Sequence, residues 1–384
     1  MKMKYTEIFN PAKGSVRTPE MEKIVKFGAN VTKMAINKII GNKGMNSFLA
    51  TKYSVPTEAE KSYIQMNDVL VNDMLQYASK MSGVNLEGLG INIKTKEGLL
   101  AAFTYESVQR AFFTIQQSIL NTINSDTEVE DALMFANIMP VGYGDSLSVD
   151  IHDKSLYKIQ DGAYGNNISV AQNKLASTIN ITPRKKHAVI DFNLAQMGIL
   201  GYDYGKEMAK LALSFRAKLY KDIVDVIFTV ANVSSTPFYK GSFAKTTFLD
   251  VAERLSAVNS ASVAAYGTKL AWGSISDTIT GGFMVQDELV KAGYIDNIFG
   301  VQSVLVNQAI DSNVSTYDFR VPNDRILMLS AVGDKPVKVV RESLPITVMV
   351  DSGVGKPLDI ARYGLQDSWT AQLCSQAHYG IVVI

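Results

Sequence analysis

The residues best suited to chemistry in this sequence are the three histidines and the single cysteine. His152, His187 and His378 lie far apart, and none belongs to an HExxH pattern. His378 follows Cys374 by four residues, so one strand through both would place them on the same face. Zinc needs more ligands than this pair, and nucleophilic catalysis needs a third group that orients the histidine. We therefore expect Cys374 to be a packed core thiol.

The segment VDSGVGKPLD, residues 350–359, is similar to a phosphate-binding loop but fails the pattern at decisive positions. Val350 stands where the loop needs glycine, and Pro357 stands where Ser or Thr holds magnesium. Leu358 replaces the third glycine of the dinucleotide-binding pattern, and no GxSxG elbow occurs. The carboxylates Asp145, Asp150, Asp153 and Asp161 lie in loop and hairpin sequence, where solvated charge is expected. We predict no catalytic residue, metal or cofactor, and no enzyme activity.

Composition narrows the class of protein further. The 384 residues carry 38 Lys and Arg against 37 Asp and Glu, a balance that argues against a dedicated nucleic-acid binder. Hydrophobic residues make up 47% of the chain, but no apolar run approaches the roughly 18 residues of a membrane span. The polar start predicts no signal peptide, and one cysteine permits no internal disulfide. We expect a protein made in a reducing cytoplasm.

The N-terminal third is predicted to be helical after a polar arm. The arm, residues 1–20, contains Pro11, Gly14 and Pro19. Apolar residues then recur at helical spacing in three segments, residues 24–40, 56–83 and about 96–123. Each segment has one apolar face, which requires a cover from this chain's own core or from a neighbouring subunit.

The middle of the chain predicts a long hairpin followed by a long helix. Residues 139–153 begin with the turn residues Pro140, Gly142 and Gly144 and then alternate as a strand does through Leu147, Val149 and Ile151. STINITPRKKHAVIDFN, residues 177–193, alternates again. Pro183 cannot donate to a strand ladder, so an edge strand or a bend is expected there. A lone hairpin is marginal in water and needs a surface, either its own domain or another copy of the chain. Residues 206–235 lack Gly and Pro and show helical spacing, which predicts a spine helix.

The C-terminal half is predicted to be mixed α/β. We expect a helix over residues 246–258, and a buried strand in TKLAWGSIS, residues 268–276. Residues 281–310 indicate a helix, a tight turn and a strand, and residues 324–342 indicate two strands joined at Gly333 and Asp334. The end, residues 368–384, is expected to be a strand pair or one long bent strand.

This order of elements resembles the major capsid proteins of tailed phages with the Hong Kong 97-type fold. MPVGYGDSLSVDIHD, QDGAYGNN, INITPRKKHAVIDFN and KEMAKLALSFRAKLYKDIVDVIF carry the resemblance, with ELVKAGYIDNIFGVQSVLVNQ and HYGIVVI, across about residues 130–384. It implies an α+β fold with a peripheral domain that holds the spine helix, an axial α/β domain and an extended β-hairpin loop. We expect an N-terminal arm and helical region over 1–130, the peripheral domain over 131–150 and 190–245, the hairpin loop over 151–189, the axial domain over 246–360 and closing peripheral strands over 361–384.

The resemblance also implies a function, a head protein that forms pentamers and hexamers of an icosahedral shell around double-stranded DNA. The location would be the virion after assembly in the host cytoplasm, with scaffold, portal and decoration proteins as further partners, weak or non-specific contact with DNA, and no membrane. The hairpin residues expected to contact a neighbouring subunit are Tyr157, Ile159, Tyr164, Ile168, Leu175, Ile179 and Ile181. The spine-helix core is expected at Met208, Leu211, Phe215, Leu219 and Ile223.

The sequence departs from this family in one respect and leaves a second property open. About 130 residues precede the fold, where some family members carry a scaffolding segment that a protease removes; we expect an intact helical region packed on the capsomer or a neighbour. Some members cross-link through a loop lysine, but nothing selects one of Lys154, Lys158 and Lys174, which are expected to be solvated. An encapsulin-like compartment, another virion protein such as a portal or tail protein, and an α/β enzyme without a recognisable motif remain alternatives.

Overall fold

The computed structural model describes most of the chain in separate ranges. These are residues 18–41, 58–93, 95–126, 135–152, 175–193, 204–230, 237–276, 297–306, 308, 319–330, 335–342, 347–349, 360–374 and 378–384. The chain divides into two compact units. Unit 1 comprises Met1–Glu128, Lys185–Arg216 and Ser343–Ser368, and unit 2 comprises Val129–Arg184, Ala217–Glu342 and Trp369–Ile384. The fold is α+β: in the described part of the chain, α2, α4, α5 and α6 precede the first strand, and α9, α10 and α11 lie between strands.

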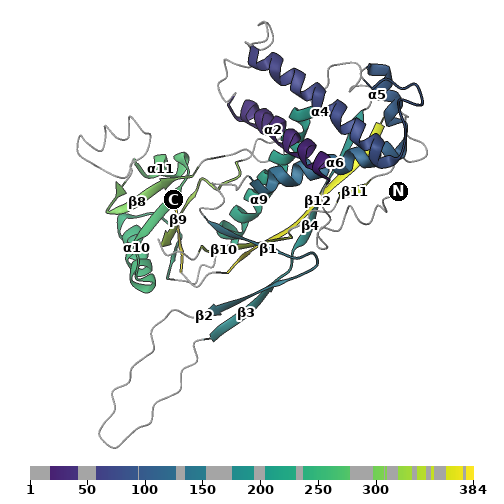
Figure 1. The fold of residues 1–384 in the computed structure, drawn as a ribbon. Coiled ribbons are helices and arrows are strands. Elements are labelled where there is room, and N and C mark those ends of the chain that lie inside the picture. The colour runs from purple at the N-terminus through teal and green to yellow at the C-terminus, as the bar shows by residue number, and fades with distance from the viewer. Residues whose placement is uncertain are drawn as a thin grey trace, which may run out of the picture. The chain divides into compact units, whose positions relative to one another are not determined.

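Helices build the N-terminal part of unit 1 (Figure 1). They are α2 (Pro19–Gly41), α4 (Glu58–Ser82), α5 (Lys96–Phe103) and α6 (Glu106–Asp126). Helices α2, α4 and α6 contact one another, and Gly28 of α2 lies against side chains of the other two. A Cβ atom on Gly28 would lie 2.5 Å from Cδ1 of Ile119 and 3.2 Å from Cδ1 of Leu70. This glycine therefore allows three helices to meet around a buried core.

The prediction of one helix over residues 96–123 was wrong, because the chain breaks it into α5 and α6. The break lies at Thr104, whose hydroxyl donates a hydrogen bond to the carbonyl oxygen of Ala101 at 2.7 Å. The backbone N–H of Thr104 turns to the same acceptor, so the last turn of α5 tightens and ends. No Gly or Pro marks this position, so the apolar spacing alone predicts one continuous helix.

A five-stranded sheet draws on strands that lie far apart in the sequence. Its order is β1 (Ala136–Val141), β10 (Val337–Glu342), β12 (Ile360–Leu373) and β11 (Thr347–Met349), and β4 (Arg184–Asn193) also pairs with β12. Strands β1 and β10 are parallel, whereas β12 is antiparallel to both β10 and β11. The long helix α9 (Tyr204–Val230) corresponds to the predicted spine helix.

A six-stranded sheet with two helices lies within unit 2. Its order is β5 (Tyr239–Lys240), β13 (Gly380–Val383), β9 (Arg325–Ser330), β6 (Val263–Gly267), β8 (Val301–Leu305) and β7 (Asn297–Ile298). Helix α10 (Lys245–Asn259) contacts β13, β9, β5 and β6, and helix α11 (Lys269–Ser276) contacts β6. The helix predicted over residues 246–258 is confirmed as α10.

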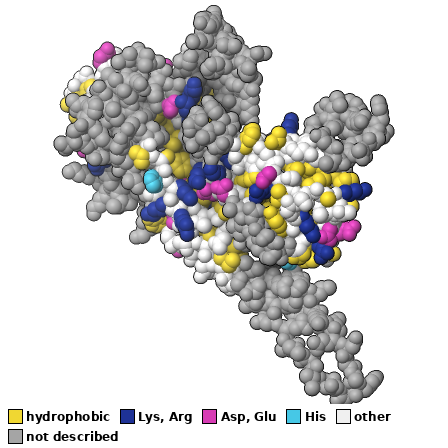
Figure 2. All heavy atoms as spheres, turned by 180° about the vertical axis from the view of Figure 1, so that it is seen from behind, with side chains coloured by type: hydrophobic (Ala, Val, Ile, Leu, Met, Phe, Trp, Pro, Cys, Tyr) yellow, Lys and Arg dark blue, Asp and Glu magenta, His cyan; other side chains and the backbone are white. Residues whose placement is uncertain are grey.

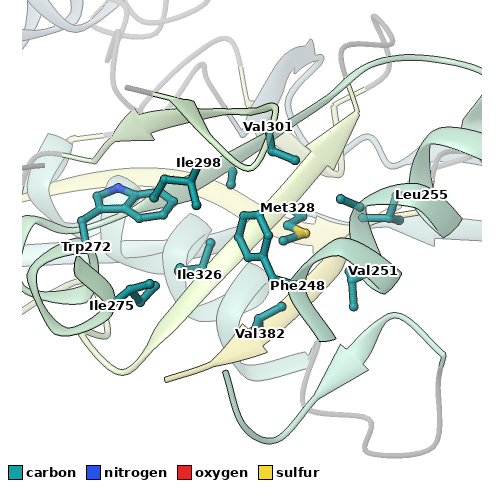
Figure 3. Close-up of a cluster of buried hydrophobic side chains, with 12 residues drawn as sticks. Phe248, Val251, Leu255, Trp272, Ile275, Ile298, Val301, Ile326, Met328 and Val382 are labelled. Atoms are coloured by element: carbon teal, nitrogen blue, oxygen red, sulfur yellow. The ribbon is translucent and has the colours of Figure 1, made fainter. Parts of the chain in front are cut away.

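The core of this sheet centres on Phe248 of α10 (Figure 3). Its ring lies among Ile326, Met328 and Val382, which come from two adjacent strands. Trp272 of α11 closes the cluster on another side, with its indole N–H donating to the carbonyl oxygen of Val304 at 3.4 Å. Every one of these side chains except Val304 is at most 1% exposed, so burial of apolar area is the main stabilising term here.

The buried strand predicted in TKLAWGSIS was wrong, since this segment forms helix α11. The hydroxyl of Thr268 accepts the backbone N–H of Ala271 at 3.2 Å and also donates to Asn323 at 2.8 Å. Threonine at this place satisfies a free N–H of the first helical turn, as an N-cap does. The true strand of this region is β6, immediately before it.

The strands predicted within residues 324–342 and 368–384 exist, but each pair is split between sheets. Strand β9 belongs to the six-stranded sheet and β10 to the five-stranded one. Likewise β12 and β13 lie in different sheets, so the C-terminal segment is neither a paired hairpin nor one long bent strand. Local alternation identifies a strand, but the partner depends on residues far away in the sequence.

Gly380→Ala is expected to destabilise the six-stranded sheet by about 1–3 kcal/mol, the usual cost of overpacking a core. An added Cβ would lie 2.6 Å from Cγ1 of Val251 and 3.0 Å from the backbone oxygen of Phe238. The matched control is Gly241→Ala, where no atom lies within 4 Å of the added Cβ. Urea denaturation of both variants checks this, and an unchanged midpoint for Gly380→Ala would contradict the packing described.

Candidate assembly interface

A two-stranded ribbon forms a third sheet, whose strands pair only with each other among the described strands. It consists of β2 (Leu147–His152) and β3 (Leu175–Ile181), which are antiparallel, and no third strand among the described residues pairs with it. The register runs from Leu147 opposite Ile181 to His152 opposite Leu175, so residues 153–174 connect the two strands at the His152 end (Figure 1). The predicted return leg, residues 177–193, is in fact two strands, because Pro183 separates β3 from β4.

The apolar face of the ribbon packs against its own unit. Ile181 is buried with Val340 of β10 and with Cys374, and four partly buried side chains complete this cluster, Val141, Leu147, Val149 and Ile179. Ile181 is 1% exposed and Cys374 is 2% exposed. The base of the ribbon is therefore anchored by a small hydrophobic core.

The opposite face of the ribbon is polar and exposed. The hydroxyl of Thr178 donates to Oδ1 of Asp150 at 2.6 Å, and the hydroxyl of Ser148 donates to Oδ1 of Asn180 at 2.6 Å. Each bond joins residues that lie opposite each other in the register. Cross-strand pairs of this kind fix the register of a narrow ribbon that has little apolar area of its own.

The residues predicted to contact a neighbouring subunit are only partly described. Tyr157, Ile159, Tyr164 and Ile168 lie outside the described residues. The backbone of Leu175 begins β3, opposite His152. Ile179 and Ile181 belong to the anchoring cluster, so their packing is within the chain. The spine-helix residues Met208, Leu211, Phe215, Leu219 and Ile223 are all at most 8% exposed.

The residues that were considered for chemistry are not brought together. Cys374 lies in the anchoring cluster, directly after β12, whereas the ring of His378 stacks on Phe238 with centroids 5.1 Å apart. Asn259 fixes the backbone of His378 through two hydrogen bonds, of 2.9 and 3.0 Å. Since β12 and β13 are separate strands, the expected shared face for Cys374 and His378 does not exist.

Other candidate chemistry can be placed as follows. Residues 350–359, the segment similar to a phosphate loop, lie outside the described ranges. Within the ranges that the structure describes, no group of three or more His, Cys, Asp and Glu residues could hold a metal ion. No described helix is both long and apolar enough to cross a membrane.

Two contacts of α9 in unit 2 were not anticipated from the sequence. The indole N–H of Trp369 donates to Oδ2 of Asp222 at 3.1 Å, and Lys218 pairs with the other oxygen of Asp222 at 2.7 Å. Arg325 donates to the carbonyl oxygen of Phe228 at 3.2 Å, near the end of the helix. Hydrogen bonds from Arg325 to Asp324 also hold the pKa of that carboxyl below its usual value. No spacing rule links positions so far apart, and only a buried Trp with a polar tip suggests a partner.

Charge on the visible described surface is mixed in sign. Lys and Arg side chains are interspersed with Asp and Glu and with hydrophobic groups (Figure 2). One local network joins Lys240, Asp250 and Arg254, with distances of 2.9 and 2.7 Å to the carboxylate. Hydrogen bonds from Lys240 and Arg254 lower the pKa of Asp250. Such exposed pairs contribute little to stability.

Ile181→Ala is expected to destabilise the chain by about 2–4 kcal/mol, because it opens a cavity in the small core that anchors the ribbon. The matched control is Asn180→Ala, the next residue, which lies on the exposed polar face and loses only its bond to Ser148. The control should cost less than about 1 kcal/mol. Chemical denaturation of both variants checks this. Equal losses would mean that the apolar face does not anchor the ribbon.

Comparisons with known proteins return structures but no family assignment. No family profile matches the chain, and no curated protein matches it. Among solved structures, the chain is similar to the capsid of a native GTA particle, with a TM-score of 0.47 and 9% identity over 67% of this chain and 91% of that one. It is similar to the capsid of the cyanophage P-SCSP1u, with a TM-score of 0.44 and 12% identity over 67% and 88% of the two chains. It is also similar to the SrpI encapsulin of Synechococcus elongatus, with a TM-score of 0.40 and 10% identity over 67% and 87%.

Proposed function

We propose that this chain is the major capsid protein of a tailed phage, with the Hong Kong 97-type fold that the sequence resembles. Copies of the chain assemble into pentamers and hexamers, and these close into an icosahedral shell around double-stranded DNA. The protein acts in the virion, after assembly in the host cytoplasm. Scaffold, portal and decoration proteins are its further partners.

The observation that carries the proposal is the β2–β3 ribbon. It is anchored on one face by the cluster around Ile181, and no described strand of the same chain extends it. Residues 153–174 connect the two strands at the end of the ribbon opposite that anchor. Because a two-stranded hairpin is marginal in water, the outer part of this excursion requires a surface. A neighbouring copy supplies one, and contacts of this head-to-tail kind close into rings.

The residues proposed to make that contact are the apolar ones beyond the anchor. They are Tyr157, Ile159, Tyr164, Ile168 and Leu175, which recur at intervals along the excursion. Ile179 and Ile181 fix the base from which it extends. The cluster around Ile181 therefore anchors the base of the hairpin. The residues beyond that base are proposed to bind the neighbouring subunit.

The remaining elements support the same proposal. Helix α9 and the five-stranded sheet correspond to the spine helix and sheet of a peripheral domain. The six-stranded sheet with α10 and α11 corresponds to an axial α/β domain, and β13 ends the chain on buried strand residues. We propose that the peripheral domain consists of α9 with the five-stranded sheet, and that the axial domain consists of α10 and α11 with the six-stranded sheet. The bounds expected from the sequence, 131–150, 190–245 and 361–384 for the peripheral domain and 246–360 for the axial domain, are revised accordingly. Strands β10 and β11 move to the peripheral domain, and β5 and β13 move to the axial domain.

The proposal is tested by what the purified assembly protects from nuclease. Particles from phage-infected or prophage-induced cells should contain double-stranded DNA that resists added nuclease until the shell is opened. Shells that protect an enzyme and no DNA would replace the phage reading with an encapsulin-like compartment. Recovery of the chain only as a part of tails or of the portal would overturn the capsid assignment.

A further inference from the structure

Strand β4 begins with a run of basic residues to which the proposed function assigns no role. Arg184, Lys185, Lys186 and His187 are consecutive, directly after Pro183. Lys185 and His187 are exposed, and so is Val189, which is 55% exposed. Because side chains alternate along a strand, these three residues share one face of β4. Lys186 and Ala188, on the other face, are half-buried.

Arg184 and Lys185 differ from other exposed Lys and Arg residues because they lack a carboxylate partner among the described residues. Elsewhere Lys26, Lys80, Arg110 and Lys210 each lie within 4 Å of a glutamate carboxylate. No carboxylate in the described part of the chain pairs with Arg184 or Lys185. Two neighbouring permanent cations that have no counter-charge among the described residues attract an external anion.

We propose that the start of β4 binds the phosphate backbone of nucleic acid. Arg184 and Lys185 supply the charge, and His187 can add a hydrogen-bond donor to a phosphate oxygen. Phosphate is favoured over a carboxylate partner because a nucleic-acid backbone offers repeated charges along a chain. These charges can meet Lys185 and His187 on one face of β4 and Arg184 on the other. Contacts of this kind read no sequence, so the binding is non-specific.

The expected binding is weak for each subunit. Arg184 and Lys185 give two charged contacts, far fewer than a dedicated DNA-binding protein makes. This agrees with the formal net charge of +1 for the whole chain. A shell repeats the contact in every subunit, so many weak contacts hold a polymer without fixing any one stretch of it.

In a shell, phosphate binding by β4 would supply the contact with the enclosed DNA, and this part of the inference rests on the proposed function. If the contained DNA meets the basic run, then the start of β4 lies at the inner side of the shell. Phosphate binding by separate subunits does not depend on shell formation, so the two proposals fail independently. Shell formation is therefore measured on the same samples, by sedimentation.

The test is fluorescence anisotropy of a labelled DNA duplex with the full-length chain before assembly. The double variant Arg184→Gln/Lys185→Gln is compared with Lys26→Gln/Lys80→Gln, which removes the same charge from glutamate-paired sites. Each phosphate contact contributes about 0.9 to the slope of log K against log salt, so the first variant should lower the slope by about 2. The fall in affinity between about 50 and about 200 mM salt should then be about tenfold smaller than for the wild type.

Competition identifies the class of anion. Inorganic polyphosphate should displace the duplex from the wild type at lower concentration than polyglutamate of equal charge. Equal slopes for the two double variants would overturn the proposal. Stronger competition by polyglutamate would also overturn it, in favour of an acidic protein partner. Unchanged slopes would overturn phosphate binding whether or not shells form, and absence of shells with a lowered slope would count against the capsid proposal alone.

Discussion

Replacing residues 153–174 with Asn-Gly is expected to give a subunit that folds and forms no shells. His152 and Leu175 lie opposite each other in the ribbon, so a two-residue turn can join them without moving the anchored part. The cluster around Ile181 remains complete, and thermal unfolding should therefore stay close to that of the wild type. Assembly should fall below detection in sedimentation, because the surface proposed to bind the neighbour is gone.

The control for this variant keeps the length and removes the side chains. A Gly-Ser segment of equal length in place of residues 153–174 should also fail to assemble, since it offers no apolar contacts. Closed shells from the Asn-Gly variant would contradict the role proposed for the hairpin. Shells from the Gly-Ser variant but not from the Asn-Gly variant would show that assembly needs the length of this segment and not its apolar side chains.

Removal of residues 1–126 is expected to abolish soluble folded protein, in contrast to removal of residues 1–17. Helices α4 and α6 are tied to the first half of α9 by three contacts within unit 1. Asn67, 4% exposed, accepts the backbone N–H of Gly205 at 2.9 Å. The rings of Phe112 and Tyr204 meet edge to face at 5.5 Å, and Arg216 donates to the carbonyl oxygen of Ile123 at 3.4 Å.

The physical reason for this loss is exposure of apolar surface. Tyr204, Met208, Ala209 and Ala212 are all at most 1% exposed, and α9 would lose the helices it contacts. Each large side chain returned to water costs about 1.5–3 kcal/mol, so a few of them exceed the net stability of a typical domain. Solubility and thermal unfolding of the two truncations measure the effect. A folded, soluble product lacking residues 1–126 would mean that the helices are a removable segment.

Long periodic elements of this fold could be predicted from the sequence. Helix α9 follows from an apolar stripe without Gly or Pro, and the buried positions of Met208 and Ile223 follow from its spacing. Strand β2 follows from the alternation of Leu147 and Val149. In these cases one local period determines both the element and its buried face.

Other features depended on single hydrogen bonds or on distant partners. The hydroxyl of Thr104 helps to end α5, and the hydroxyl of Thr268 caps the start of α11. The spacing of apolar residues contains no information about either hydrogen bond. The threonine that opens Thr-Lys-Leu-Ala is a usable N-cap signal, whereas the apolar residues that follow it favour a strand on local pattern alone. The anchoring of the ribbon by Cys374 and Val340 joins three regions of the chain, and no local pattern contains that information.

The most direct test of the central claim is negative-stain electron microscopy of the full-length chain, with sedimentation of the same sample. We expect closed shells, capsomer rings or sheets of repeated capsomers, and rings or sheets alone would indicate that a scaffold partner is needed for closure. A monomer of 42.0 kDa that persists across protein concentration and salt would contradict the account.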